Sequence, residues 1–506
     1  MTDHTVPAEL RETHTGLVVL CADRAYKVKK SVRTDFLDFS TPRLREHACL
    51  REVELNRRLA ADVYLGVGHL SDPCGGAAEP VVVMRRMPED ARLSNVLDTA
   101  AGTAELSALV QVIAEFHRTA RRGHDIDTEG SAAALRRRWR VLLDGFIDQP
   151  ADVADPRIVA RIEWLAMRYI DGREPLLNAR IAEGRIVDGH GDLQAEDIFE
   201  LADGFRVLDC LDFDDRLRYV DCLDDIAFLA MDLEYRGHAE LSTRLLDDYQ
   251  RATEDTAPTS LRSHYIAYRA LVRAKVDVIR FGQGEEAARD RVHRHLLLAL
   301  RHLERAAVRL VLIGGLPGTG KSTVARELGA ATDAALLSSD HVRAQLRAAH
   351  KVTGATGSFG VGAYSATAKA RVYSELRSKA RELLAAGRSV ILDASWIDAV
   401  ERQRAAELAE ESDADILRLR CHCPPSVADN RLRHRAGGDS DATPQIAADM
   451  AVTASVWPEA VPVDTALTLT DTIAAARRAW DRAESTGFDQ QIDVGLRRMS
   501  PNAAVS

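Results

Sequence analysis

A glycine-rich segment in the second half of the chain constrains the fold more than any other feature. Residues Gly315–Thr323 match the pattern GxxxxGK followed by Ser and Thr, after the apolar run Leu310–Ile313 and before the helix-forming run Val324–Leu328. A loop of this kind between a strand and a helix wraps phosphates with its backbone N–H groups. Lys321 is then expected to reach the β- and γ-phosphates of a nucleotide, and Ser322 to ligate magnesium. The full set of expected nucleotide-binding residues is Gly315, Gly318, Thr319, Gly320, Lys321, Ser322 and Thr323.

Apolar strands alternate with helical periodicity on both sides of this loop. Besides the run before the loop, they are Leu336–Leu337, Val390–Leu392 and Ile416–Leu417. This alternation predicts a parallel sheet covered by helices on both faces. Ligands of such sheets collect at the carboxyl ends of the strands. Asp393, which directly follows a strand, is therefore a candidate carboxylate for the magnesium site.

A second strand end carries residues suited to a phosphoryl acceptor. If Ser339 caps a helix after the strand Ala335–Leu337, Asp340 and Arg343 lie three residues apart on one helix face. Asp340 can then deprotonate an attacking hydroxyl while Arg343 binds a substrate anion. The alternative interpretation of Asp340 is an ordinary acid in the first turn of a helix.

Two arginines further along the chain are candidates for a lid that closes over the phosphates of a bound nucleotide. Arg431 and Arg435 lie four residues apart on a predicted helix, just before the flexible sequence Gly437–Asp441. Arginines in such a place can close over a transferring phosphate. Solvent-exposed surface arginines are the alternative interpretation.

The first half carries an unusual cluster of lysines. Only eight of the 67 basic residues are lysine, yet Lys27, Lys29 and Lys30 fall in one predicted strand. Glu52 lies on the predicted buried face of the following helix, where a carboxylate needs a cationic partner. We expect Lys27 to be that partner, with Lys29 as the alternative, and a simple surface strand of lysines as the third interpretation. The predicted buried face also contains Leu44, Ala48, Leu55 and Leu59.

Two carboxylates flank a predicted β-hairpin in the first half. Asp192, in the sequence His190–Leu193, precedes the hairpin, and Asp209 follows it. The hairpin consists of Ile198–Leu201, a turn at Asp203 and Gly204, and Arg206–Leu208. Because a hairpin brings its two ends together, one carboxylate can accept a hydroxyl proton while the other holds magnesium.

The motifs of the second half resemble those of the P-loop small-molecule and polynucleotide kinases that are often described as AAA-type ATPases. The resemblance covers residues 305–470 and includes Ser440–Pro444. It implies that Asp340 activates the acceptor hydroxyl and that the lid arginines contact the phosphates. The strand-end motif after Asp393, Ala394-Ser395-Trp396, varies in this group, so the acceptor is not indicated.

The motifs of the first half resemble the aminoglycoside phosphotransferase and choline-kinase-like fold, over residues 1–300. The resemblance implies a Lys27–Glu52 pair at the nucleotide phosphates, Asp192 as the catalytic base, and Asp197 and Asp209 as magnesium ligands. Asp224–Ala227 is similar to a downstream structural element of that family. Gln194 stands where the family usually has His, and Asp197 where it usually has Asn. The whole chain resembles bacterial two-domain proteins known as bifunctional aminoglycoside phosphotransferase/ATP-binding proteins.

Composition narrows the classes of partner. The net charge of −10 disfavours a dedicated duplex nucleic-acid binder. No apolar run approaches the roughly 20 residues that a membrane helix needs, and the first residues do not read as a signal peptide. These features predict a cytoplasmic protein that does not bind membranes, and they do not indicate its oligomeric state.

The sequence therefore predicts an α+β protein-kinase-like domain over residues 1–304, followed by an α/β P-loop domain with a parallel sheet over residues 305–506. We expect transfer of the γ-phosphoryl group of ATP, with Mg2+, to a hydroxyl of a small molecule such as a sugar or aminoglycoside, or of a nucleic-acid end. The P-loop domain is the surer catalyst. The first alternative makes the first domain a regulatory or substrate-recruiting pseudokinase, and the second is a nucleotide-switched interaction protein without an acceptor.

Overall fold

A computed structural model describes residues 8–12, 16–33, 38–71, 75–97, 106–352, 362, 365–434 and 443–482. The chain divides into two compact units. The first unit comprises Met1–Arg138, Asn178–Ala257 and Tyr265–Ala299, and the second comprises Trp139–Leu177, Pro258–His264 and Leu300–Ser506. Parts of the first half of the sequence therefore belong to the second unit, and the predicted boundary near residue 304 remains a prediction.

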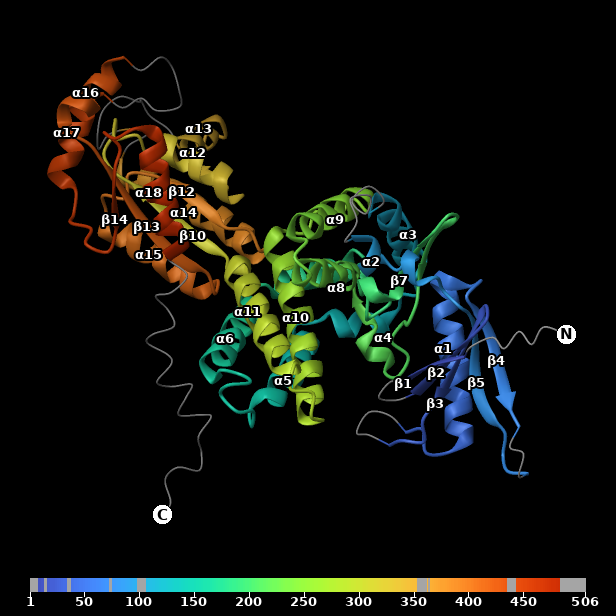
Figure 1. Ribbon diagram of the computed structural model, residues 1–506. Coiled ribbons are helices and arrows are strands. Elements are labelled where there is room, and N and C mark those ends of the chain that lie inside the picture. Colours follow the sequence, from blue (N-terminus) through green and yellow to red (C-terminus); the bar gives the residue numbers. More distant parts are fainter. Residues whose placement is uncertain are drawn as a thin grey trace. The chain divides into compact units, whose positions relative to one another are not determined.

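The first unit begins with a five-stranded antiparallel sheet in the order β1-β2-β3-β5-β4. Helix α1 lies along one face of this sheet (Figure 1) and packs on β4 and β5. Thr41 caps α1 by accepting a hydrogen bond from the Leu44 backbone N–H. The elements are β1 (Glu9–Glu12), β2 (Gly16–Cys21), β3 (Arg24–Lys29), α1 (Pro42–Ala60), β4 (Tyr64–Leu70) and β5 (Glu79–Arg85).

The buried face of α1 differs in part from the prediction. Glu52 is buried as expected, at 1% exposure, but Leu44 is exposed. The face is formed instead by Arg45, Cys49, Val53, Asn56 and Ala60, together with Leu55. Arg45 and Asn56 are polar, so an analysis of apolar spacing placed the face about one residue away from its true position.

The rest of the first half is largely helical and contains two short pairs of antiparallel strands, β6 with β9 and β7 with β8. The β7–β8 hairpin confirms the strand pair predicted between Asp192 and Asp209. The strands are β6 (Ile186–Asp188), β7 (Ile198–Leu201), β8 (Gly204–Val207) and β9 (Tyr219–Asp221). The helices are α2 (Leu93–Leu97), α3 (Leu106–Thr119), α4 (His124–Asp127), α5 (Ala132–Leu143), α6 (Pro156–Gly172), α7 (Glu174–Ala182), α8 (Cys222–Tyr235), α9 (Ala239–Ala252), α10 (Thr259–Gly282) and α11 (Ala288–Ala306).

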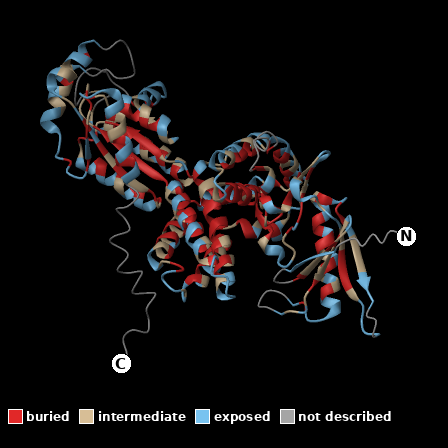
Figure 2. Cartoon of the chain, viewed as in Figure 1, coloured by how far each residue is buried: buried red, intermediate tan, exposed pale blue. Residues whose placement is uncertain are grey.

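The second unit is built on a five-stranded parallel sheet in the order β11-β12-β10-β13-β14. Its central strands β10 and β12 are buried along their whole length (Figure 2), as expected for a sheet covered on both faces. The strands are β10 (Arg309–Gly314), β11 (Ala335–Ser338), β12 (Val390–Asp393), β13 (Asp415–His422) and β14 (Val461–Asp464).

Helices cover both faces of this sheet. Helices α12 and α18 pack together on one side, and α14 packs beside α15 and α13 on the other. The core beneath α12 and α18 includes Val311, Leu328, Leu417 and Trp480. The helices are α12 (Lys321–Thr332), α13 (Ser339–Ala348), α14 (Ala366–Ala385), α15 (Ala399–Glu411), α16 (Pro425–Arg433), α17 (Pro444–Thr453) and α18 (Leu469–Arg482).

Both predicted fold classes are confirmed: an α+β kinase-like first part and an α/β P-loop second part with a parallel sheet. Among the residues that the structure describes, no helix is both long and apolar enough to cross a membrane.

Residues from the first half of the sequence contribute contacts inside the second unit. Arg173, just after α6, is almost fully buried. Its guanidinium donates to the carbonyl oxygens of Leu384, Ser412 and Asp413, which lie near the ends of α14 and α15. Nearby, the Ser260 hydroxyl donates to the Gly387 carbonyl oxygen at 2.6 Å. These bonds provide donors to the carbonyl groups of Ser412 and Asp413 after α15, whereas the Leu384 carbonyl oxygen also accepts from the Gly387 backbone N–H at 3.0 Å.

A buried histidine makes the second unit sensitive to acid. His264 is 1% exposed, stacks on Tyr169 and accepts a hydrogen bond from Trp139 Nε1 at 3.2 Å. Burial lowers the pKa of His264 to about 3.

Because the unfolded chain binds a proton at this histidine near pH 6.5 and the folded unit does not, stability is lost as the pH falls below 6.5. Between pH 6.5 and pH 5, we expect His264 to reduce the free energy of unfolding by about 2 kcal/mol. Urea unfolding at several pH values measures this loss. His264→Gln, which cannot titrate, should flatten the pH dependence by that amount, and equal slopes for both proteins would contradict the prediction.

Candidate active sites

The phosphate loop of the second unit depends on glycines at two close approaches. Gly315 has φ +139° and Gly318 has φ +82°, a region that residues with a side chain rarely adopt. A Cβ at Gly315 would lie 2.4 Å from the Cys421 carbonyl oxygen, and one at Gly318 would lie 2.6 Å from that of Ala428. The loop can therefore hold this shape only with glycine at both positions, as the sequence pattern predicted.

Lys321 lies at the start of α12 and turns back over the loop. Its Nζ donates to the Leu316 carbonyl oxygen at 3.0 Å, and the Thr319 hydroxyl donates to the same oxygen at 2.8 Å. The Thr465 hydroxyl, after β14, donates to the Thr319 carbonyl oxygen at 2.8 Å. The ammonium group therefore lies among the backbone groups that would surround phosphates.

A cavity of about 310 Å³ lies beside this loop. It brings the predicted residues of four segments together: the loop, the start of α13, the end of β12 and α16. Asp393 is 4% exposed and lies at this cavity with Ser322, so the two oxygen donors that magnesium would need are both present. The predicted residues that line the cavity are Gly318, Gly320, Lys321, Ser322, Thr323, Asp340, Arg343, Asp393 and Arg431.

Asp340 and Arg343 form an ion pair on one face of α13, with 2.5 Å between Oδ1 and Nη1. The residue that caps α13 is Ser338, whose side chain accepts from the Asp340 N–H, so the expectation that Ser339 is the cap is wrong by one residue. The capping change leaves Asp340 and Arg343 on the same face, because their spacing sets that relation. Asp340 remains 32% exposed and open to the cavity.

Arg431 binds the segment that also supports the phosphate loop. Its guanidinium donates to the Thr465 carbonyl oxygen at 2.7 Å and to the Thr465 hydroxyl at 3.3 Å. Arg431 therefore lies at the cavity and beside Gly320. Arg435 and the loop Gly437–Asp441 lie outside the described residues.

Sequence reasoning missed several cavity residues, and three of them have polar side chains. Lys369 and Tyr373 come from α14, and Ser395 follows β12. The Tyr373 hydroxyl lies 3.3 Å from Ser395 Oγ and accepts from the Trp396 backbone N–H at the same distance. Lys369 is one of the chain's eight lysines, and that rarity is a signal that could have found it.

In the first unit, Glu52 pairs with both candidate lysines. Its carboxylate oxygens lie 2.9 Å from Lys27 Nζ and 2.8 Å from Lys29 Nζ. Lys27 also contacts Asp209 at 2.9 Å, and Lys29 contacts Asp212 at 3.0 Å. Although burial lowers it, the charges of Asp209 and Glu52 raise the pKa of Lys27 well above its usual value. Lys27 is the lysine that lies beside a predicted magnesium ligand.

The three predicted carboxylates of the first unit act on one another. Burial raises the pKa of Asp192 to about 6, and burial together with the charges of Asp209 and Asp192 raises the pKa of Asp197 well above its usual value. The Lys27 ammonium lowers the pKa of Asp209. Within the described residues, however, no three His, Cys, Asp or Glu side chains form a ready-made metal site. Asp209, one of the two predicted magnesium ligands, forms an ion pair with Lys27 at 2.9 Å.

The loop that carries Asp192 is held by Asp225, which sequence reasoning placed only in a structural element. Asp225 is fully buried and accepts from the backbone N–H groups of His190 at 2.7 Å and Gly191 at 2.8 Å. It also lies 3.0 Å from His117 Nε2. A side-chain contact acts on Asp192 directly, because Gln194 Nε2 donates to Asp192 Oδ1 at 2.8 Å.

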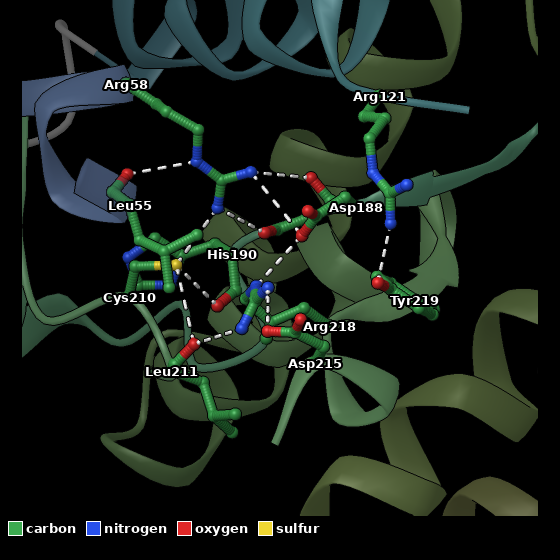
Figure 3. A network of polar contacts seen from close by, with 12 residues as sticks. Leu55, Arg58, Arg121, Asp188, His190, Cys210, Leu211, Asp215, Arg218 and Tyr219 are labelled. Atoms are coloured by element: carbon green, nitrogen blue, oxygen red, sulfur yellow. Dashed lines mark hydrogen bonds and ion pairs between the residues drawn. The ribbon is translucent and has the colours of Figure 1, made fainter. Parts of the chain in front are cut away.

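Arg58 joins α1 to the same loop (Figure 3). It donates to the carbonyl oxygens of Asp188 and Gly189, each at 2.9 Å, and to the Cys210 sulfur at 3.1 Å. Arg218 pairs with Asp188 from another direction, at 2.8 Å. Because α1 also carries Glu52, these contacts link the lysine pair to the loop of Asp192.

Comparison with known proteins extends over both halves. A family model described as "AAA domain" matches residues 310–456. "Uncharacterized protein Rv2004c" of Mycobacterium tuberculosis is 48% identical over 479 residues, which cover 94% of this chain and 96% of that protein.

Two solved structures also match this chain. A choline/ethanolamine kinase family protein from Mesorhizobium loti has 16% identity and a TM-score of 0.35, over 60% of this chain and 94% of that one. A gluconokinase from Sinorhizobium meliloti 1021 has 17% identity and a TM-score of 0.28, over 36% of this chain and 97% of that one.

The match to an AAA domain agrees with the phosphate loop and its parallel sheet. In the first unit, the expected ion pair between Lys27 and Glu52 is present at 2.9 Å. The mycobacterial relative shares both halves. The chain joins a kinase-like α+β part to a P-loop domain with a parallel sheet, and it belongs to the family of this mycobacterial protein.

Proposed function

We propose that the second unit transfers the γ-phosphoryl group of ATP to a hydroxyl group, either of a small molecule such as a sugar or aminoglycoside-like compound or of a nucleic-acid end. One observation carries the proposal: a single cavity contains both the phosphate loop with Lys321 and the Asp340–Arg343 pair. A nucleotide switch would need the loop but no hydroxyl-activating carboxylate facing it.

Each residue of this cavity has a distinct chemical role in the proposed reaction. Bound magnesium ATP supplies the phosphoryl group, and Ser322 and Asp393 are the residues that would hold its metal ion. Lys321, Arg343 and Arg431 offset the negative charge at the phosphates. Asp340 accepts the proton of the acceptor hydroxyl, whose oxygen then forms the new bond to phosphorus as the bond to the ADP oxygen breaks.

For the first unit we propose a second phosphoryl-transfer site, with Asp192 as the base, Lys27 and Glu52 at the nucleotide, and Asp197 and Asp209 as magnesium ligands. The Lys27–Glu52 pair beside Asp209 supports this role. The alternative, a regulatory or substrate-recruiting pseudokinase, is favoured by the raised pKa of Asp197, which burial and two neighbouring carboxylates hold toward its neutral form.

The proposal for the second unit predicts the effect of Asp340→Asn. The amide keeps the shape of the side chain and cannot accept the proton, so transfer to an acceptor should fall about a hundredfold or more while ATP binding stays unchanged. Radiolabelled ATP with a panel of hydroxylated acceptors measures transfer, and equilibrium dialysis measures binding. The parent background should carry Asp192→Ala, so that the first unit does not contribute.

Asp471→Asn is the matched control. Asp471 is also an acid in the first turn of a helix, α18, and it accepts a hydrogen bond from Thr468 at 2.6 Å. If Asp340 only stabilises its helix, both substitutions should leave transfer at the parent rate. That result would remove Asp340 from the catalytic residues and favour the nucleotide switch.

A further inference from the structure

Helix α10 brings an arginine to the catalytic loop of the first unit. Arg269 is buried and donates from Nη1 to the Gly191 carbonyl oxygen at 3.1 Å. Its other nitrogens bind the Asp224 carboxylate at 2.8 Å and 2.9 Å. Gly191 directly precedes Asp192, so this face of α10 lies beside the expected base.

A second arginine lies on the same face, one turn further along. Arg273 follows Arg269 by four residues, which places the two side chains next to each other on the helix. Burial raises the pKa of Asp192, and the largest opposing effect is the charge of Arg273, ahead of that of Arg269. Arg273 is partly buried, so its positive charge is near Asp192 without being fully removed from solvent.

The two arginines differ in what already binds them. The Arg269 side chain forms an ion pair with Asp224. No hydrogen bond or ion pair within the described part of the chain engages the side chain of Arg273. Asp277, one turn beyond Arg273, is held by Arg291 at 2.8 Å and His295 at 3.1 Å. Arg273 is therefore a cation beside Asp192, and Asp277, the carboxylate one turn away on the same helix, is bound to other partners.

Three acidic groups near this site already have cationic partners. Asp209 is paired with Lys27, Asp224 with Arg269, and Asp232 with Arg236. A cationic acceptor whose hydroxyl group lies at Asp192 would be repelled by the charge of Arg273. None of these three carboxylates is unpaired and able to offset that repulsion. An acceptor with a carboxylate or phosphate group would instead gain a charge-assisted hydrogen bond.

We propose that the first unit binds an anionic acceptor, a hydroxylated small molecule whose carboxylate or phosphate group is bound by Arg273 while its hydroxyl group reaches Asp192. The inference rests on the proposed phosphoryl transfer in this unit and specifies the class of its acceptor. Arg273 is the residue that selects this class, and it disfavours polyamine acceptors.

Four sugars that differ in charge test the proposal: glucose, glucosamine, glucuronate and glucose 6-phosphate. Their affinities are measured by calorimetry on the full chain with Lys321→Ala, alone and combined with Arg273→Gln. We expect at least one of the two anionic sugars to bind about tenfold tighter than glucose, and glucosamine to bind more weakly. The comparison of glucuronate with glucose 6-phosphate distinguishes a carboxylate from a phosphate.

Arg273→Gln should remove the preference for the anion and leave the affinity for glucose within twofold. Arg280→Gln is the matched control, because Arg280 lies on the same helix with its side chain 45% exposed. Tightest binding of glucosamine, an anion preference that survives Arg273→Gln, or equal or unmeasurable binding of all four sugars would each overturn the proposal. Phosphate transfer is measured in the same samples with Lys321→Ala alone, as a separate test of the proposed catalysis. If the anion binds through Arg273 but no transfer occurs, the proposed catalysis by the first unit is wrong and the proposed binding site stands.

Discussion

Lys321→Ala is expected to reduce phosphoryl transfer by the second unit about a thousandfold or more, because it removes the ammonium group that neutralises charge on the transferring phosphoryl group. The loop should keep its shape, since Gly315 and Gly318, which allow its close approach to the carbonyl oxygens of Cys421 and Ala428, are unchanged. Transfer from radiolabelled ATP by the full chain, in an Asp192→Ala background, measures the effect.

Lys379→Ala is the control for losing any lysine. Lys379 lies on α14 with its side chain 34% exposed, and it contacts Gln345 and Glu375 on the surface. The Lys379→Ala substitution should leave phosphoryl transfer and the stability of the protein unchanged. Transfer by Lys321→Ala within twofold of its parent would exclude the phosphate loop from the reaction.

Asp225→Ala is expected to destabilise the first unit by about 3 kcal/mol or more. The substitution leaves two buried backbone N–H groups, those of His190 and Gly191, without their acceptor, and it removes the buried partner of His117. Urea unfolding followed by circular dichroism measures the loss.

Asp203→Ala provides the comparison. Asp203 lies in the β7–β8 turn, 68% exposed, and pairs with Arg206 on the surface, so its removal should change stability by less than about 1 kcal/mol. If Asp225→Ala proved as mild as Asp203→Ala, the loop of Asp192 would have to be held by other contacts.

The features predicted correctly from the sequence are those set by local spacing. Gly315–Thr323 form one continuous segment of loop and first helical turn, and Asp340 and Arg343 need only a helix to share a face. Neither relation depends on the tertiary fold. Glu52 was recognised as buried because charge on an apolar helix face is rare.

The features that the sequence did not reveal depend on contacts between distant segments. Arg269 bonds to Gly191 across 78 residues of sequence. Lys369 lies at the cavity on α14, and the sequence pattern of α14 indicates only a helix that covers the sheet. In an arginine-rich chain, no local signal separates Arg269 from a surface arginine, because its burial arises only when α10 packs beside the loop of Asp192.

The contacts of Arg173 bear on how the gene of such a protein can be inherited. A division between the two halves would leave the carbonyl groups of Leu384, Ser412 and Asp413 without the guanidinium that binds them. Exchange of one half for an unrelated one would leave the same three carbonyl groups without this donor. The mycobacterial relative, 48% identical across 94% of this chain, also contains both halves.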